Sequence, residues 1–184
     1  MRNSISIIFI IHLIFAINHL TLDAIYLKLN LEKNTLKDPI IPEEINVVSI
    51  GLNSLGKEIF LSKKCALAWN EMQKNAQKDS IEISILSGFR SYYKQYSIIQ
   101  YKLNSGLPLE KILKENKLPG LSQHHSGNAI DIISNSYKLS LEFENSLAYA
   151  WLLKNAYKYG FHLTYPKNNK QGIMFEPWHW HFKE

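Results

Sequence analysis

Two short stretches of this chain carry the residue types from which catalytic metal sites are built. Residues 122–131 read Ser-Gln-His-His-Ser-Gly-Asn-Ala-Ile-Asp, and residues 176–179 read Glu-Pro-Trp-His. Such a site combines three protein ligands with an open position for water, and a nearby carboxylate can serve as general base. Four of the seven histidines lie in or beside these stretches: His124, His125, His179 and His181. The clustering indicates a zinc site rather than scattered loop histidines.

The first stretch is predicted to be a turn that leads into a strand. His124 and Asp131 are seven residues apart, and Gly127 between them suits a turn with unusual backbone angles. The strand expected over residues 128–133 places Asp131 among isoleucines, on the face that Ala129 shares. A carboxylate buried there is costly unless it is paired or coordinated to a metal. His125, next to His124, stays an uncertain ligand.

The second stretch is predicted to enter a strand over residues 178–182. Alternation places three aromatic side chains on one face, which we expect to join the core, and His179 and His181 on the other. Pro177 cannot donate a ladder hydrogen bond, so Glu176 should lie at the entrance of the strand. A carboxylate there can approach a ligand-bound water without itself binding the metal. The strand pattern does not decide whether His179, His181 or both would bind the metal.

Composition indicates a globular protein with a basic surface. The chain has 184 residues, 46% of them hydrophobic and 20% charged, and a net charge of +5. A basic surface suits nucleic acid or an anionic bacterial wall. The lysines are scattered and form no dense basic run interleaved with aromatics, so no nucleic-acid partner is expected. The single cysteine, Cys65, excludes an internal disulfide and is expected to be a small buried apolar residue.

The first twenty residues resemble an export signal. Met1-Arg2-Asn3 is positively charged, and residues 5–17 are almost continuously apolar but short for a membrane span. We therefore expect residues 1–20 to be a signal peptide or an N-terminal anchor, and no other stable membrane span. No clear Ala-x-Ala cleavage site follows, and a buried N-terminal helix is the alternative. Export to the periplasm or cell envelope is the expectation.

The remaining pattern predicts an α+β fold with a small antiparallel sheet packed with helices. Residues 21–55 are expected to form an extended lead-in, and residues 56–184 the functional domain. Apolar periodicity and turn residues predict helices over 57–77, 92–103, 109–114 and 142–159, the last ended by Gly160, and strands over 81–86, 128–133, 161–165 and 178–182.

The motifs resemble the D-alanyl-D-alanine carboxypeptidase family of zinc peptidases, the VanY-like group that also includes LD-carboxypeptidases. The family pattern Ser-x-His-x-x-Gly-x-Ala-x-Asp is matched by residues 122–131, and Glu-x-x-His by residues 176–179. An upstream Gly-Phe-Arg-Ser-Tyr followed by Gln is matched by residues 88–92 and Gln95. Three motifs in the same order make the resemblance specific. It covers roughly residues 35 to 184.

The resemblance implies a hedgehog/DD-peptidase-like fold with the zinc site on the face of the sheet. It implies that His124, Asp131 and His179 bind Zn²⁺ and that Glu176 is the catalytic base. Arg90 would hold the substrate and stabilise the developing oxyanion, with Gln95 and Ser122 as further substrate-binding residues. Family members commonly carry Arg after Trp-His-Trp, where this chain has His181. That difference leaves open a supporting role for His181 beside the ligands.

The function expected from these residues is removal of the C-terminal D-alanine from peptidoglycan stem peptides. An LD-carboxypeptidase acting on tetrapeptide stems is the alternative in the same class, because no motif reports the stereochemistry of the penultimate residue. A non-catalytic, metal-bound wall-binding module is a different class of protein. Glu176 argues against such a module, because a pure binder needs no base at that position.

Overall fold

The computed structural model describes residues 21–32, 36, 38–135 and 138–184. The predicted signal peptide or anchor of residues 1–20 lies outside the described residues. Among the residues that are described, no helix has the length and apolar character needed to cross a membrane.

A four-stranded antiparallel sheet forms the centre of the fold. Its order is β3 (Ser84–Ser87), β4 (Ala129–Ile133), β6 (His179–Phe182) and β5 (Phe161–Leu163). A separate hairpin joins β1 (Val47–Leu52) to β2 (Glu58–Ser62). The α+β prediction with a small antiparallel sheet is confirmed, and strands lie close to the predicted positions at 81–86, 128–133, 161–165 and 178–182.

The main core lies between this sheet and the helices α3 (Lys63–Lys78) and α6 (Leu147–Asn155). Ile130 and Ile132 of β4 and Trp180 of β6 are buried in it. Side chains alternate along a strand. Asp131, between the two isoleucines, and His179, next to Trp180, therefore project from the opposite face of the sheet. Cys65 is fully buried in the same core, as expected. The prediction that the aromatic residues of the last strand pack inward is also confirmed, since Trp178 and Phe182 contact the core.

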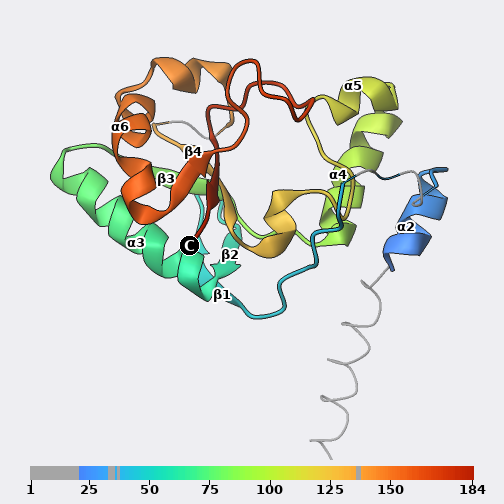
Figure 1. Ribbon diagram of the computed structural model, residues 1–184, viewed down its shortest axis with the longest axis horizontal. Helices are drawn as coiled ribbons and strands as arrows, with labels where there is room; N and C mark the ends of the chain where they lie inside the picture. Colours follow the sequence, from blue (N-terminus) through green and yellow to red (C-terminus); the bar gives the residue numbers. More distant parts are fainter. Residues whose placement is uncertain (1–20, 33–35, 37, 136–137) are drawn as a thin grey trace, which may run out of the picture.

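A second apolar cluster supports the other side of the molecule. It joins α2 (Leu22–Lys28) to α4 (Tyr92–Asn104) and α5 (Leu109–Leu113) through Ile25, Ile99 and Ile112, which are at most 1% exposed. Figure 1 shows α2 beside α4 and α5, away from α3 and α6. The Tyr26 hydroxyl donates to the Pro119 carbonyl at 2.8 Å, which ties α2 to the loop before the first motif.

Two of the predictions for the N-terminal part of the chain are wrong in part. The helix predicted over 57–77 begins at Lys63, because residues 58–62 pair with β1 and bury Ile59 and Leu61 with strand periodicity. The Ser62 side chain then caps the helix by accepting from the Cys65 N–H. The lead-in at 21–55 is not simply extended, since it contains α2 and β1.

The predicted helix over 142–159 is divided into three pieces. They are the 3-10 helix Leu141–Asn145, α6, and the 3-10 helix Ala156–Tyr159. The first boundary falls at Ser146, whose extended backbone ends one helix and whose hydroxyl caps the next by accepting from the Tyr149 N–H. The second falls between Asn155 and Ala156. Gly160 ends the last piece with a left-handed φ of 79°, as expected for a C-cap.

Candidate metal centre

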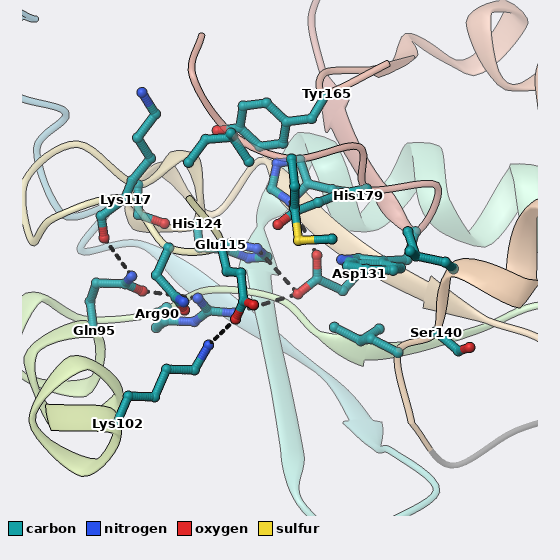
Figure 2. A pocket seen from close by; sticks show the side chains of 18 residues that line it. Arg90, Gln95, Lys102, Glu115, Lys117, His124, Asp131, Ser140, Tyr165 and His179 are labelled. Carbon is teal, nitrogen blue, oxygen red and sulfur yellow. Dashed lines mark hydrogen bonds and ion pairs between the residues drawn. The ribbon is translucent and has the colours of Figure 1, made fainter. Parts of the chain in front are cut away.

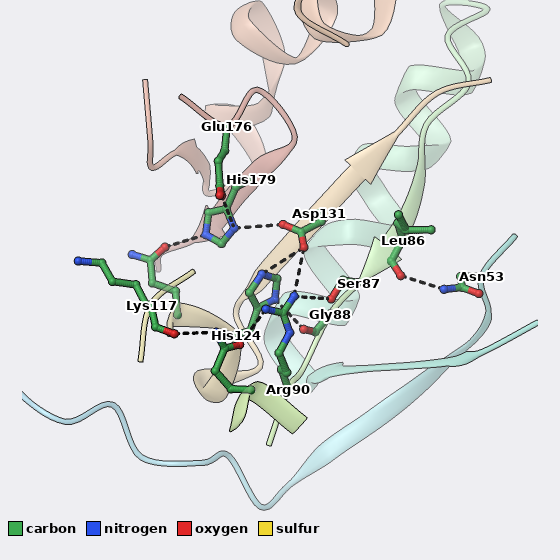
Figure 3. A network of polar contacts seen from close by, with 12 residues as sticks. Asn53, Leu86, Ser87, Gly88, Arg90, Lys117, His124, Asp131, Glu176 and His179 are labelled. Atoms are coloured by element: carbon green, nitrogen blue, oxygen red, sulfur yellow. Dashed lines mark hydrogen bonds and ion pairs between the residues drawn. The ribbon is translucent and has the colours of Figure 1, made fainter. Parts of the chain in front are cut away.

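Asp131 and His179 face each other across two neighbouring strands. They are register partners in the antiparallel β4–β6 pair, and Asp131 Oδ1 lies 3.1 Å from His179 Nδ1. His124 approaches from the 3-10 turn Gln123–Ser126, with its Nε2 3.3 Å from Asp131 Oδ2. Figure 3 shows both imidazoles directed at the one carboxylate. All three side chains are buried.

Glycine is required where this turn meets the strand. Gly127 has a φ of 68°, and a Cβ there would lie 2.8 Å from the Ser62 backbone nitrogen. Any other residue would therefore be strained and would also displace β2. The turn that was predicted to lead into a strand is confirmed, and it delivers His124 to the strand face that carries Asp131.

Both imidazoles are oriented by partners outside the cluster. His124 Nδ1 lies 2.7 Å from the Gly88 carbonyl oxygen, which can only accept, so Nδ1 carries the hydrogen. His179 Nε2 likewise donates to Gln123 Oε1 at 3.0 Å. The other ring nitrogens, His124 Nε2 and His179 Nδ1, are thereby turned toward Asp131. In a neutral imidazole the nitrogen opposite the N–H is a lone pair, and two such lone pairs beside a carboxylate are an arrangement that a cation between them stabilises.

The spacing of these donor atoms fits a single ion. One donor atom from each of His124, Asp131 and His179 lies within 4.8 Å of the others. Ligands at about 2.0–2.1 Å from a tetrahedral zinc are separated by about 3.3 Å, close to the two imidazole–carboxylate distances given above. Two neutral imidazoles and one carboxylate are a common donor set for catalytic zinc. The three residues therefore fit a metal ion.

The ionisation states follow from burial and from mutual contact. Burial lowers the pKa of His124 to about 4, more than the charge of Asp131 raises it. Burial acts to raise the pKa of Asp131, but His124 and His179 outweigh it, and the pKa falls well below its usual range. The cluster thus holds a neutral His124 and an ionised Asp131 at neutral pH, which are the forms that bind metals.

Glu176 lies beside the cluster at the entrance of the last strand, as predicted. Its Oε2 is 3.8 Å from His179 Nδ1, and its N–H donates to the Tyr165 carbonyl at 3.0 Å. Burial, and then the charge of Asp131, raise the pKa of Glu176 to about 8. A carboxyl group with a pKa near neutrality can both accept and return a proton.

Arg90 joins the cluster from the loop after β3. Its Nη2 lies 3.5 Å from Asp131 Oδ2 and donates to the Ser87 hydroxyl at 3.0 Å, while Nη1 donates to Gln95 Oε1 at 2.9 Å. Burial lowers the pKa of Arg90, and the charges of Asp131 and Glu176 oppose that shift. A guanidinium held by three side chains is a preorganised cation.

Gln95 and Ser122 are brought to the same place. Gln95 is 1% exposed on α4, and its Nε2 donates to the Lys117 carbonyl at 2.6 Å. Ser122 is also buried, at the start of the turn that carries His124. Both line a cavity of about 470 Å³ that also contains Arg90 and the three donor residues. Figure 2 shows this cavity, with Gln95 between Arg90 and Lys117.

The two histidines left open by the sequence lie outside the three-residue cluster. His125 bridges two backbone groups: its Nδ1 donates to the Arg90 carbonyl at 2.5 Å, and its Nε2 accepts from the Gly120 N–H at 3.1 Å. It therefore holds Arg90 in place. His181 lies opposite Ala129 in β4, and its Nδ1 is buried with no hydrogen-bond partner among the described residues.

Three residues near the cluster were not identified from the sequence. Gln123 orients His179, Ser87 accepts from Arg90, and the Tyr165 ring lies 4.9 Å from the His179 ring between centroids. Gln123 stands at a variable position of its motif, and the other two come from separate segments. No local signal connects them with the site.

The comparisons with known proteins agree with this geometry. The family model described as VanY, D-alanyl-D-alanine carboxypeptidase, matches residues 58–184. The chain belongs to this family. The match contains all of the residues of the cavity discussed above, and the family resemblance of the motifs is confirmed.

Individual relatives cover most of this chain. YodJ of Bacillus subtilis (strain 168), a protein named as a carboxypeptidase, is 35% identical over 148 residues, which are 77% of this chain and 52% of YodJ. The chain thus spans about half the length of this curated relative. The solved LdcB LD-carboxypeptidase is 32% identical, with a TM-score of 0.69 over 76% of this chain and 69% of that one. VanYB, solved in complex with D-alanine-D-alanine, is 25% identical, with a TM-score of 0.62 over 78% of this chain and 81% of VanYB.

Proposed function

We propose that this protein is a zinc carboxypeptidase that removes the C-terminal D-alanine from peptidoglycan stem peptides. The observation that carries the proposal is the cluster of His124, Asp131 and His179, with Glu176 beside it in one cavity. The family description names this activity, and VanYB was solved with the dipeptide that ends such stems. We propose the same three residues as the zinc ligands.

Zinc supplies Lewis-acid chemistry: it polarises a carbonyl group and makes water a stronger acid. Glu176 accepts the proton of the attacking water and passes it to the leaving amine. Its pKa of about 8 belongs to the chain without an ion, and a nearby cation favours the ionised form, which is the base. Arg90 provides a fixed positive charge for the oxyanion that develops on the scissile carbonyl.

Gln95 and Ser122 are proposed to bind the substrate. Gln95 is held between the Arg90 guanidinium and the Lys117 carbonyl, so it forms a fixed part of the cavity wall. Ser122 adds a small polar side chain next to the turn that carries His124. The Gln95 side chain is positioned by these two contacts before any substrate arrives, which reduces the entropy lost on binding.

Two further proposals concern location and stereochemistry. Action on peptidoglycan requires a place outside the cytoplasmic membrane, and the charged and apolar start of the chain supports export to the periplasm or cell envelope. The likeness to LdcB favours a second candidate, an LD-carboxypeptidase that shortens tetrapeptide stems. The cavity and catalytic residues suit either substrate.

One experiment tests the function and separates these candidates. Purified protein is incubated with pentapeptide and tetrapeptide stems, with and without a chelator, and the products are read by mass spectrometry. Loss of one alanine from the pentapeptide supports the DD activity, and loss from the tetrapeptide supports the LD activity. Either activity should disappear with the chelator and return with zinc. If neither peptide is shortened by zinc-loaded protein, the proposed function is wrong.

A further inference from the structure

Residues 38–46 lie between α2 and β1 and form neither a helix nor a strand; we call them the strap. Figure 1 shows the strap running past α4 before it reaches β1. The family match begins at residue 58, so it does not include the strap. The strap nevertheless contacts two segments of the site, those that carry His124 and Arg90.

On one side, the strap is bonded to the segment that carries His124. The Ile41 N–H donates to the Gly120 carbonyl at 2.7 Å, and the Glu44 N–H donates to the His125 carbonyl at 2.8 Å. Gly120 and His125 are both buried, and their carbonyl groups receive these hydrogen bonds from the strap. The strap thus fixes the chain at two points, one before His124 and one after it.

On the other side, the strap is bonded to Tyr92, which begins α4 two residues after Arg90. The Tyr92 N–H donates to the Glu43 carboxylate, and its hydroxyl donates to the Ile41 carbonyl at 2.8 Å. The Tyr92 ring also packs edge-on against the His125 ring, with the centroids 4.7 Å apart. The strap therefore holds the start of α4, and with it the end of the loop from which Arg90 projects.

His125 connects these two sets of contacts inside the protein. Its side chain is fully buried, donates from Nδ1 to the Arg90 carbonyl and accepts at Nε2 from the Gly120 N–H. Gly120 is thus bonded to the strap through its carbonyl and to His125 through its N–H. The hydrogen bonds form a continuous series from Ile41 through Gly120 and His125 to the backbone of Arg90.

We propose that the strap and His125 position Arg90 for catalysis. The inference rests on the proposed function, in which the Arg90 guanidinium stabilises the oxyanion. Three side chains orient that guanidinium, but the Arg90 backbone lies in a loop and is itself held by the His125 bond and by the anchored Tyr92. A misplacement of about 1 Å at a reacting centre reduces the rate by as much as about 100-fold. The strap therefore belongs to the catalytic unit although it does not line the cavity.

Two substitutions of His125 separate a positioning role from simple packing. His125→Leu keeps a side chain of similar size but removes the donor to the Arg90 carbonyl. His125→Asn is smaller, but its amide lies near the position of Nδ1 and can donate the same bond. In the zinc-loaded full chain, His125→Leu should lower kcat by about tenfold to 100-fold with zinc content unchanged and KM little changed, and His125→Asn should recover most of that loss. Packing alone predicts the opposite order, because leucine fills the buried site better, and that order would overturn the proposal.

A double-mutant cycle determines whether His125 acts through Arg90. In Arg90→Lys protein the guanidinium that His125 positions is absent, so adding His125→Leu should lower kcat by less than about twofold further. An equal loss in the wild-type and Arg90→Lys backgrounds would mean that His125 acts independently of Arg90, which contradicts the positioning role.

The contribution of the strap is measured with a matched pair of proline substitutions. Ile41→Pro removes the N–H that donates to the Gly120 carbonyl, and it should lower kcat by about tenfold. The control is Ile45→Pro in the same strap, where the side chain is 87% exposed and the N–H bonds to no described residue. Ile45→Pro should retain the wild-type kcat. Similar activities of the two variants would show that the strap does not position Arg90.

Amide hydrogen exchange tests the same link without turnover. The Arg90 N–H donates to the His124 carbonyl, so its exchange reports how firmly this loop is held. Exchange at residue 90 should be about fivefold faster in Ile41→Pro and His125→Leu, with the amides of α3 unchanged. If wild-type protein shortens no stem peptide but exchange responds in this way, the proposed function fails and the hold of the strap on Arg90 stands. If wild-type protein is active and neither kcat nor exchange at residue 90 responds, the positioning role is wrong and the function stands.

Discussion

Arg90 and His124 share one oxygen of Asp131. The Arg90 guanidinium lies 3.5 Å from Oδ2, and His124 Nε2 lies 3.3 Å from the same atom. The backbone joins the two residues as well, since the Arg90 N–H donates to the His124 carbonyl at 3.1 Å. The proposed oxyanion cation and a proposed metal ligand are therefore one rigid unit, with Asp131 as their common partner.

Replacing Arg90 with Lys should separate its positive charge from its geometry. The lysine keeps the charge but cannot contact Gln95, Ser87 and Asp131 at once, because it lacks the planar fork. We expect kcat to fall by about 100- to 1,000-fold, as for the loss of an oxyanion donor, with zinc content unchanged. Steady-state kinetics with metal analysis tests this, and full activity in Arg90→Lys would remove Arg90 from the proposed mechanism.

Glu176→Ala should abolish release of D-alanine and leave about one zinc per chain. The carboxylate is proposed as a base and not as a ligand, so its loss removes proton transfer without removing a donor atom. Product release and metal content are measured on the same sample. Retained turnover would contradict the role of base, and loss of zinc would show that Glu176 is itself a ligand.

Glu176 should also make the metal-free protein sensitive to alkali. Its pKa is raised in the folded chain to about 8 from 4.5, so the folded state binds more protons than the unfolded state between these values. The stability contributed by the protonated form is present below pH 4.5 and lost as pH rises through 8. In chelator-treated protein, Glu176→Gln should therefore raise the melting temperature more at pH 9 than at pH 5. An equal effect at both pH values would show that the raised pKa is wrong.

His181→Ala should lower activity without emptying the metal site. His181 follows His179 by two residues on β6 but lies outside the donor cluster, and a residue supporting the ligands typically affects activity by about tenfold. The control is His162→Ala, an exposed histidine that pairs with His181 across β5 and β6. Kinetics and zinc analysis test both variants. Loss of zinc in His181→Ala would mean that the ligand set is wrong.

The N-terminal helix should stabilise the substrate side of the cavity. Ile25 is fully buried against α4 and α5, and its replacement by Ala should cost about 2–5 kcal/mol in the free energy of unfolding. Leu27 on the same helix is 80% exposed, so Leu27→Ala should change it by less than about 0.5 kcal/mol. Urea unfolding of the full chain measures both. Similar stabilities for the two variants would show that α2 does not support this wall.

This packing bears on the domain boundary expected at residue 56. The predicted domain of residues 56–184 lacks α2 and β1, and both contact elements within that range. The boundary stays a prediction. The N-terminal elements were not recognised in the sequence because a seven-residue helix and a short strand leave little periodicity, and their apolar faces are defined by partners far along the chain.

Local pattern was sufficient for the chemistry of the site. The residue types and spacing of the two motifs indicated a metal site built from Asp131 and the nearby histidines, and period-two alternation placed Asp131 and His179 on the face opposite the core. The choice of His124 and His179 among the four histidines came from the family resemblance. Pro177 and Gly127 located the strand entrance and the turn. Each of these inferences depends on neighbours within a few residues, which is the range over which backbone preferences act.

Contacts between distant segments were decided by the tertiary structure. The alternation of side chains predicts which face of the sheet Asp131 and His179 occupy. The register of β4 against β6 then places the two residues opposite each other, although they are 48 residues apart in the sequence. The same holds for His125, whose Nδ1 donates to the Arg90 carbonyl 35 residues away instead of joining the cluster, and for the Lys102–Glu115 ion pair. Strand register and helix packing are selected by the energy of the whole core, so a short window of sequence does not contain them.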